Sequence, residues 1–338
     1  CRMKALVCTT PGRFNYSNTE MPTPTEGETL LKIERIGICG TDLHAFEGTQ
    51  PYFNYPRILG HELAATIIET KAVGFAAGDK VTIIPYMHCG NCTACNSGKN
   101  NCCVNMRVFG VHIDGGMREF VTVPNHALLK SEGLSLDELA LIEPLAIGAH
   151  AVKRAAIANS EFVLVIGAGP IGRGIAQFAR IAGAHVIVVD VNDDRLQFCT
   201  THVGVEHTIN PLSQDVMEAL KQITSNNMPT VVMDATGNLK AINNAFAYLA
   251  HGGRYVLVGL QKEHISFSHP EFHKREATLM SSRNANVSDF EHVMDCIKNG
   301  LVQPANYITH KVVFSEVATQ FESWLNPNSK VVKAMVVF

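Results

Sequence analysis

The stretch Val163-Leu-Val-Ile-Gly167-Ala-Gly169-Pro170-Ile171-Gly172 places a run of apolar residues directly before a glycine-rich segment. The apolar run is typical of a buried strand, and residues with helical spacing follow it. Gly167 permits a tight turn, Gly169 lets backbone amides approach a pyrophosphate, and Gly172 lets the helix pack close to the strand. The positive end of that helix then faces the phosphates. The stretch therefore predicts a dinucleotide-binding loop that includes Pro170 and Ile171.

A carboxylate follows the next apolar run. Asp190 ends the run 184–190 and lies 18 residues after Gly172, where it can accept hydrogen bonds from the adenosine ribose hydroxyls. A negative charge at this position repels a 2′-phosphate, so the sequence favours NAD over NADP. The alternative interpretation is that Asp190 only caps the helix that begins near Asp193.

Apolar runs and helical stretches alternate through this part of the chain. We expect strands at 162–166, 184–190, 208–209, 231–233 and 254–258, with helices near 171–182, 193–201, 213–224 and 238–250. This alternation predicts an α/β fold with a doubly wound parallel sheet of the Rossmann type. The flanking sequence is β-rich, so we expect a β-rich domain formed by 1–145 and 284–338, with the Rossmann domain at 146–283.

Shorter strands and few helices are expected in the β-rich domain. The expected strands are 3–7, 29–36, 63–68, 80–85 and 331–338, and the expected helices are 289–299 and 315–325. Asp114-Gly-Gly116 separates two further apolar runs, 108–113 and 119–123, and predicts a hairpin.

Three potential metal ligands lie in two short segments of the β-rich domain. Gly37-Ile-Cys39-Gly-Thr41-Asp-Leu-His44 supplies a thiol, and Gly60-His61-Glu62 supplies an imidazole and a carboxylate. These are the ligand types of a catalytic zinc that keeps its fourth position open. The hydroxyl of Thr41 and the imidazole of His44 can carry a proton away from such a site.

Glu143 is a further candidate for this site. It stands in Ile142-Glu143-Pro144, at an apolar helix start where a carboxylate is costly unless it has a partner. A cation or its bound water would be such a partner, and a helix-capping contact is the alternative. The residues leave open whether Glu62 or Glu143 completes the shell of the catalytic zinc.

Five of the ten cysteines fall between residues 89 and 103. Cys89, Cys92, Cys95 and Cys103 have the spacing of a closed tetrahedral zinc site, which indicates a structural role. Cys102 is adjacent to Cys103 and is expected to face away. A cysteine cluster in a large chain with no leader segment is typical of metal binding in a reducing compartment, so we expect a cytoplasmic protein.

The composition excludes several other functions. The formal charge of −3 gives no basic surface for nucleic acid, and no run of 18 apolar residues suggests a membrane span.

Taken together, these segments resemble the zinc-dependent medium-chain alcohol and polyol dehydrogenases. The matching segments extend almost from end to end and include Glu143-Pro-Leu145 and the C-terminal Lys333-Ala-Met-Val-Val-Phe338. The resemblance implies a β-rich GroES-like catalytic domain, a catalytic and a structural zinc, NAD, and a homo-oligomer. It places Cys39, His61, Glu62 and Glu143 at or next to the catalytic zinc. It also implies that Thr41 receives the substrate proton and that His44 passes it on.

Two cations receive roles from the same resemblance. It places Arg283 near the zinc-bound water and the substrate, and Lys333 near the cofactor phosphates. A closer similarity to bacterial sugar-acid dehydrogenases rests on the segments 48–57, 110–116, 270–276 and 281–285. It implies a hexonate substrate of the L-galactonate type, whose carboxylate needs a cation. Arg283, Lys274 and Arg57 are the candidates, with a solvated surface charge as the alternative for Lys274 and Arg57.

Other functions remain open at this stage. The substrate of the same reaction could be a polyol such as sorbitol, or threonine. A zinc-free reductase is disfavoured by Cys39, His61 and Glu62, and a sensing or structural zinc protein is disfavoured by the Thr41–His44 pair. The expected reaction is oxidation of a secondary hydroxyl to a ketone, in a cleft between the two domains that closes to exclude water.

Overall fold

The computed structural model describes residues 2–51 and 53–338, so Cys1 and Tyr52 lie outside the described residues. The chain forms two compact units. Unit 1 comprises the residues up to Glu143 together with Asn286–Phe338, and unit 2 comprises Pro144–Ala285. Unit 1 is therefore discontinuous in sequence, and unit 2 is a single segment.

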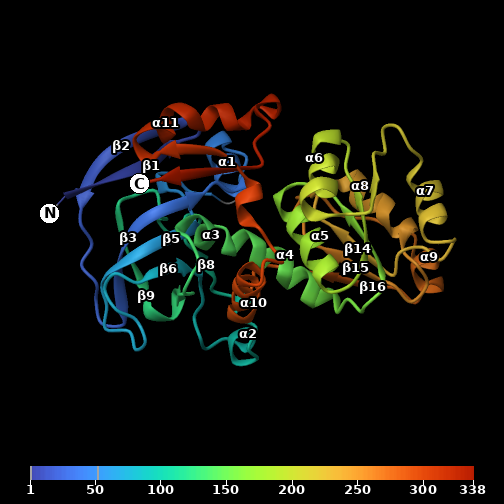
Figure 1. The fold of residues 1–338 in the computed structure, drawn as a ribbon, viewed down its shortest axis with the longest axis horizontal. Coiled ribbons are helices and arrows are strands. Elements are labelled where there is room, and N and C mark those ends of the chain that lie inside the picture. Colours follow the sequence, from blue (N-terminus) through green and yellow to red (C-terminus); the bar gives the residue numbers. More distant parts are fainter. Residues whose placement is uncertain (1, 52) are drawn as a thin grey trace. The chain divides into compact units, whose positions relative to one another are not determined.

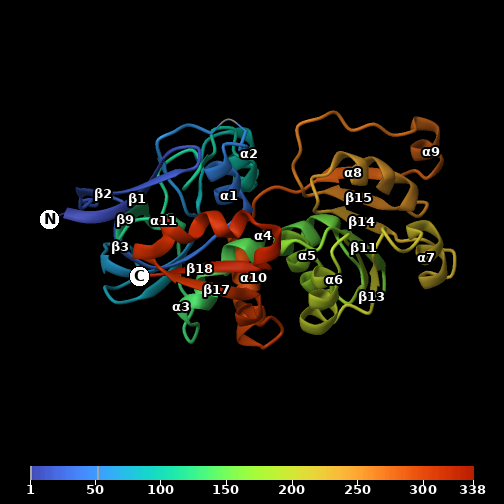
Figure 2. The ribbon, with the colours of Figure 1, turned by 90° about the horizontal axis from the view of Figure 1, so that it is seen from above.

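Unit 2 is built on a parallel sheet of six strands. Their order is β13-β12-β11-β14-β15-β16, and every neighbouring pair is parallel. Figure 2 shows β15, β14, β11 and β13 in this order across the sheet. The strands are β11 (Phe162–Ile166), β12 (His185–Val189), β13 (His207–Ile209), β14 (Val231–Asp234), β15 (Arg254–Leu257) and β16 (Thr278–Ser281). The predicted doubly wound α/β fold is confirmed.

The helices of unit 2 follow the strands as the alternation predicts. They are α4 (Ile142–Ala155, which begins in unit 1), α5 (Pro170–Ile181), α6 (Asp193–Phe198), α7 (Val216–Ile223), α8 (Leu239–Ala245) and α9 (His269–Lys274). The central strands are buried on both faces, as expected of a parallel sheet covered by helices. Strand β16 is an edge strand that the sequence analysis missed. Its residues are partly exposed, so it lacks the continuous apolar run of the central strands.

Unit 1 contains three sheets. The largest has the order β10-β6-β5-β3-β18-β17, and β9 also pairs with β3. A second sheet has the order β2-β1-β4, and β7 pairs with β8. Figure 1 shows red C-terminal strands beside blue N-terminal strands. Strand β18 pairs with β3, and β17 pairs with β18, so the two sequence parts of the unit share one sheet. Leu31, Ile33 and Ile36 of β3 are fully buried in the core of this unit.

The strands of unit 1 are short apart from the first three and β5. They are β1 (Arg2–Thr10), β2 (Arg13–Glu20), β3 (Glu28–Gly37), β4 (Arg57–Ile58), β5 (Glu62–Glu69), β6 (Lys80–Ile83), β7 (Tyr86–Met87), β8 (Arg107–Val108), β9 (Phe120–Pro124), β10 (Leu128–Leu129), β17 (Ile308–Val313) and β18 (Lys333–Val337). The helices are α1 (Gly40–Glu47), α2 (Thr93–Asn96), α3 (Leu136–Ala140), α10 (Val287–Lys298) and α11 (Val317–Gln320).

The hairpin predicted around Asp114-Gly-Gly116 is wrong. Strand β8 pairs with β7, and β9 pairs with β3. The glycines allow close packing instead of a two-residue turn. A Cβ at Gly115 would lie 2.4 Å from the Gly60 carbonyl oxygen, and the Gly115 amide donates to the Ile58 carbonyl over 2.7 Å. This segment therefore packs against the residues just before His61.

The helix predicted at 315–325 is also not continuous. Only Val317–Gln320 is α-helical, and 3₁₀ turns lie on both sides of it. Among the described residues, no helix combines the length and apolar character needed to cross a membrane.

Candidate active site

A buried carboxylate positions the two segments that carry the predicted catalytic zinc ligands. Strand β3 ends at Gly37, and Cys39 precedes α1 in extended conformation. Asp42 Oδ2 accepts the Cys39 amide over 3.0 Å, and its Oδ1 accepts the Gly60 amide over 3.1 Å. Asp42 is only 1% exposed. One side chain thus fixes the backbone next to Cys39 and next to His61.

The structure brings Cys39, His61 and Glu62 together. One potential ligand atom from each lies within 4.8 Å of the others. His61 and Glu62 are buried, and among the described residues His61 Nδ1 has no hydrogen-bond partner. Burial disfavours the imidazolium form, but the negative charges of Asp42 and Cys39 outweigh it and hold the pKa of His61 well above its ordinary value. This group of a thiol, an imidazole and a carboxylate, with His61 Nδ1 3.8 Å from Asp42 Oδ1, fits a bound divalent cation.

Glu62 is also held by a buried cation. Lys333 Nζ on β18 lies 2.7 Å from both carboxylate oxygens and 3.0 Å from the Ile38 carbonyl oxygen. Burial lowers the pKa of Lys333, but the negative charge of Glu62 outweighs this and raises it overall. The ammonium group thus has close protein partners in unit 1, and its predicted contact with cofactor phosphates stays a prediction.

Glu143 lies beside this cluster but is not one of its three grouped ligands. Its Oε1 accepts a short hydrogen bond from the Tyr86 hydroxyl, and its buried Oε2 has no partner among the described residues. Burial raises the pKa of Glu143 to about 7, with the charge of His61 opposing the shift. Glu143 Oε1 does not cap the helix, because it accepts its hydrogen bond from the Tyr86 side chain.

Thr41 and His44 both lie on α1, three residues apart and therefore on one side of the helix. His44 is exposed, and its Nδ1 lies 3.0 Å from the Thr49 hydroxyl and 3.5 Å from Glu47 Oε2. The order from partly buried Thr41 to exposed His44 leads from the interior to solvent, as proton transfer requires.

The four predicted cysteines of the second site also lie together. The sulfur atoms of Cys89, Cys92, Cys95 and Cys103 lie within 4.8 Å of one another. Backbone hydrogen bonding from Asn91 lowers the pKa of Cys89 to about 6, which favours the thiolate that binds metal. Four thiolates at this separation fit a closed tetrahedral zinc site. Cys102 is exposed and is not part of the group.

The glycine-rich loop of unit 2 connects β11 to α5. Gly167 has a φ of 96°, and a Cβ at Gly172 would lie 1.7 Å from the Gly167 carbonyl oxygen, so both positions require glycine. By contrast, a Cβ at Gly169 would meet nothing within 4 Å. The loop therefore leaves open space in front of the first residues of α5, Pro170 and Ile171, as a bound pyrophosphate requires.

Asp190 follows β12 and lies against this loop. Its Oδ2 accepts the Ala168 amide over 2.6 Å, and its Oδ1 accepts the Asn192 amide over 2.8 Å. The next helix is capped by the Asn192 side chain, which accepts from the Arg195 amide. The capping interpretation of Asp190 is therefore not supported.

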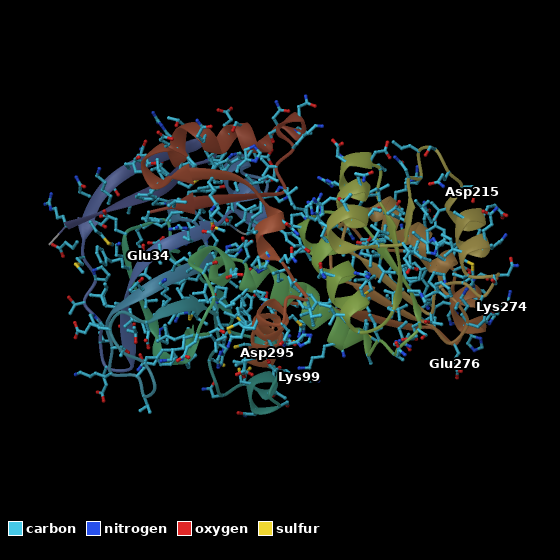
Figure 3. The ribbon with its side chains drawn as sticks, viewed as in Figure 1. Glu34, Lys99, Asp215, Lys274, Glu276 and Asp295 are labelled. Carbon is cyan, nitrogen blue, oxygen red and sulfur yellow. The ribbon has the colours of Figure 1, made fainter. Side chains whose placement is uncertain are left out.

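The candidate cations for a substrate carboxylate are dispersed. Arg283 is exposed and follows β16 in unit 2. Arg57 on β4 lies 3.4 Å from Asp114 and has a side chain only 17% exposed. Lys274, labelled in Figure 3, lies at the surface on α9, with a side chain 63% exposed and 3.9 Å from Glu271. Lys274 thus fits a solvated surface charge, and the roles of Arg283 and Arg57 stay predictions.

Two residues beside the candidate metal ligands, Asp42 and Tyr86, were not predicted from the sequence. Asp42 had a usable signal, because it stands three residues after Cys39, where an acidic side chain completes a capping box. Tyr86 had none, because a tyrosine after an apolar run does not show where its hydroxyl points.

Known proteins resemble this chain over nearly its whole length. The family model described as "Zinc-binding dehydrogenase" matches residues 170–299, and that described as "Alcohol dehydrogenase GroES-like domain" matches residues 25–133. The chain is 41% identical to L-galactonate-5-dehydrogenase of Escherichia coli K12 over 99% of both chains. It is 31% identical to a sorbitol dehydrogenase of Halalkalibacterium halodurans, covering 93% of this chain and 94% of the relative.

A solved structure of a short chain alcohol dehydrogenase from Escherichia coli CFT073, complexed with NADH, has the same fold. It superimposes with a TM-score of 0.92 at 31% identity, and the match covers 100% of this chain and 99% of that one.

Proposed function

The chain belongs to the zinc-dependent medium-chain alcohol dehydrogenase family, and we propose that it oxidises a secondary hydroxyl group of an L-galactonate-type sugar acid to a ketone. It is an oxidoreductase that uses zinc and NAD. Unit 1 is the GroES-like domain and unit 2 is the Rossmann domain.

The observation that supports the sugar acid is the 41% identity to L-galactonate-5-dehydrogenase over nearly the full length of both chains. The identity to the sorbitol dehydrogenase is lower, at 31%. A polyol remains the second candidate substrate for that reason, and threonine the third. A hexonate differs from both in carrying a net negative charge, so its recognition requires a protein cation near the substrate carboxylate.

Cys39, His61 and Glu62 are the residues that would hold the catalytic zinc. The glycine-rich loop and Asp190 would hold NAD. When bound, zinc supplies Lewis acidity that lowers the pKa of a hydroxyl group, and NAD supplies the acceptor for a hydride. The Cys89–Cys103 group would hold a structural zinc with no open position.

Other residues of the chain transfer the proton and hold the metal-binding side chains in place. The Thr41 hydroxyl would take up the substrate proton as it releases its own, and His44 would pass a proton to solvent from the exposed side of α1. Asp42 holds the segment of Cys39 next to the segment of His61. Asp190 accepts hydrogen bonds from the ribose hydroxyls and repels a 2′-phosphate.

A substrate panel tests this function. The holoenzyme is assayed for NADH formation with L-galactonate, sorbitol and L-threonine. We expect kcat/KM for L-galactonate to exceed that for sorbitol by about 100-fold or more, because a neutral polyol leaves the recognising cation unpaired. Equal or higher activity with sorbitol would transfer the assignment to a polyol dehydrogenase. The Cys39→Ser variant should lose turnover and retain NAD binding, and unchanged turnover in that variant would refute the zinc role.

Metal analysis separates the remaining alternatives. Two zinc ions per chain are expected from the two groups of ligands, whereas one would support a zinc-free reductase that retains only the cysteine site. NAD-linked turnover of any panel substrate would exclude a purely structural or sensing protein. We also propose that the protein is a cytoplasmic homo-oligomer. Sedimentation of the purified holoenzyme would test whether it is an oligomer.

A further inference from the structure

We infer that Tyr86 is a positioning residue whose hydroxyl holds Glu143 outside the metal coordination shell and so keeps the fourth coordination position open. This inference rests on the proposed zinc chemistry at Cys39, His61 and Glu62. It distinguishes the two buried carboxylates of the site: Glu62 as a ligand, and Glu143 as an acceptor beside it.

Tyr86 is fixed on three sides. Its backbone lies in β7, which pairs with β8 through Tyr86 and Val108. Its ring packs edge-on against Phe290, with the ring centroids 6.3 Å apart. Its side chain is buried, and its hydroxyl donates to Glu143 Oε1. The position of the hydroxyl is therefore set by the surrounding packing and not by solvent.

The two oxygens of Glu143 have different surroundings. Oε1 has its hydrogen bond from Tyr86, whereas Oε2 is buried and has no partner among the described residues. The charges of His61 and Glu62 both act on this carboxylate, so it lies next to the ligand cluster. An unpartnered buried carboxylate oxygen next to a metal cluster points to a ligand, such as a metal-bound water or a substrate hydroxyl.

A hydrogen bond from Tyr86 limits what Glu143 can do. A carboxylate is a good zinc ligand, and a fourth protein ligand would close the site as in structural zinc centres. Glu62 is held in place by Lys333. Among the described residues, the Glu143 carboxylate is held by the Tyr86 hydroxyl alone. Removal of that hydroxyl leaves Oε1 buried without its donor, and coordination of the metal would then satisfy it.

The test uses the holoenzyme with cobalt(II) exchanged for zinc and imidazole as an added ligand. Imidazole changes the visible absorption of cobalt only where a coordination position is open, so the four-cysteine site does not contribute. In Y86F we expect the imidazole difference spectrum to fall at least fivefold. We also expect kcat with L-galactonate to fall by about 10- to 100-fold, as for other groups that orient metal ligands. The affinity for NAD should not change.

Further variants separate positioning from general disturbance. In Y86F/E143Q the imidazole response should return, because a neutral amide is a poor zinc ligand. E143Q alone should keep the response and both metals, which tests the placement of Glu143 even if Y86F does not fold. Tyr255→Phe is the matched control, since it removes another buried hydroxyl, which donates to the Ile242 carbonyl over 3.0 Å.

Each result has a defined meaning. A Y86F spectrum that responds to imidazole as the wild type does would overturn the inference. Loss of the response in Y86F without recovery in Y86F/E143Q would overturn it as well, as would loss of one metal in E143Q. If the wild-type cobalt enzyme shows no response to imidazole, or turns over no panel substrate, the proposed function itself has failed.

Discussion

The ammonium nitrogen of Lys333 lies 2.7 Å from each carboxylate oxygen of Glu62, and both side chains are buried. The two residues are 271 positions apart in the sequence. This ion pair joins strand β18 to the strand that starts with the predicted zinc ligand, β5. A buried pair of this kind has a large effect when only one partner is removed, because the other charge stays behind without compensation.

We therefore expect Lys333→Met to lower the free energy of unfolding by about 3–5 kcal/mol. Methionine keeps much of the side-chain volume and removes the charge. Urea denaturation of the metal-free protein measures the change, because a cation bound to Glu62 would itself compensate the remaining charge. Lys130→Met is the control, because its ion pair with Asp79 is exposed to solvent and should contribute much less to stability. Equal effects of the two substitutions would show that the Glu62 pair is not a strong determinant of stability.

A methyl group at Gly37 should disturb the same carboxylate from the other side. A Cβ there would lie 2.1 Å from Glu62 Oε2, so Gly37→Ala should displace Glu62 and cause loss of the catalytic zinc. Metal analysis should then find about one zinc per chain, since the four-cysteine site is unaffected. Gly40→Ala is the matched control: its Cβ meets nothing within 4 Å, and both metals should remain. Retention of both metals in Gly37→Ala would contradict the assignment of Glu62.

The open space at Gly169 should matter for cofactor binding and not for the stability of the fold. Gly169→Ala should leave thermal stability nearly unchanged, because no protein atom lies within 4 Å of the new Cβ. NAD affinity should fall by about tenfold or more, because the methyl group occupies the approach of the pyrophosphate. Isothermal titration with NAD measures this. Gly174→Ala, inside the helix that follows Gly169 and with only an ordinary contact at 3.9 Å, should bind NAD as the wild type does.

The adjacent residues Cys102 and Cys103 should differ in their effect on the structural zinc. Cys103→Ser should remove the structural zinc, whereas Cys102→Ser should retain it, because Cys102 is exposed and outside the group of four sulfurs. Zinc content and proteolysis of the segment 89–103 are the measurements. If Cys102→Ser lost the metal and Cys103→Ser kept it, the assignment of the fourth ligand would be reversed.

The stability of unit 2 should depend on pH through Glu161. Burial alone would raise the pKa of this carboxyl, but hydrogen bonds from the Ala158 amide, Arg254 and Thr230 outweigh it and lower the pKa. A lowered folded-state pKa means that the stabilisation is complete above the unfolded-state pKa and is lost as pH falls through the folded-state value. The stability difference between wild type and Glu161→Gln should therefore shrink from pH 6 towards pH 3.

The Arg254→Met background provides the control for this prediction. The effect of Glu161→Gln at pH 6 should be smaller there, because the arginine nitrogen that donates to both carboxylate oxygens of Glu161 is gone. A difference between wild type and Glu161→Gln that is constant with pH would contradict the proposed linkage.

The sequence predicts best those sites whose residues lie close together along the chain. The glycine-rich loop and the four cysteines each lie within about fifteen residues, and their backbone requirements are visible in the residue types. The parallel sheet was also predictable, because its central strands are continuous apolar runs. Strand β16 escaped because edge strands lack that run.

Contacts between distant segments could not be predicted in the same way. Nothing in the local sequence of Lys333 indicates that its partner is Glu62, and nothing near Tyr86 indicates Glu143. The glycines at 115 and 116 were predicted to form a turn, because a glycine pair is compatible both with a turn and with close packing against Gly60. Only the tertiary fold decides between these.

The insertion of strand β18 between β3 and β17 has a consequence for biosynthesis. A polypeptide emerging from a ribosome presents Cys39, His61 and Glu62 long before the cation that balances Glu62 has been translated. The nucleotide-binding unit, by contrast, is one uninterrupted segment and can fold before β17 and β18 have been translated. The catalytic centre should thus mature later than the nucleotide-binding unit, with metal loading after β18 has been made.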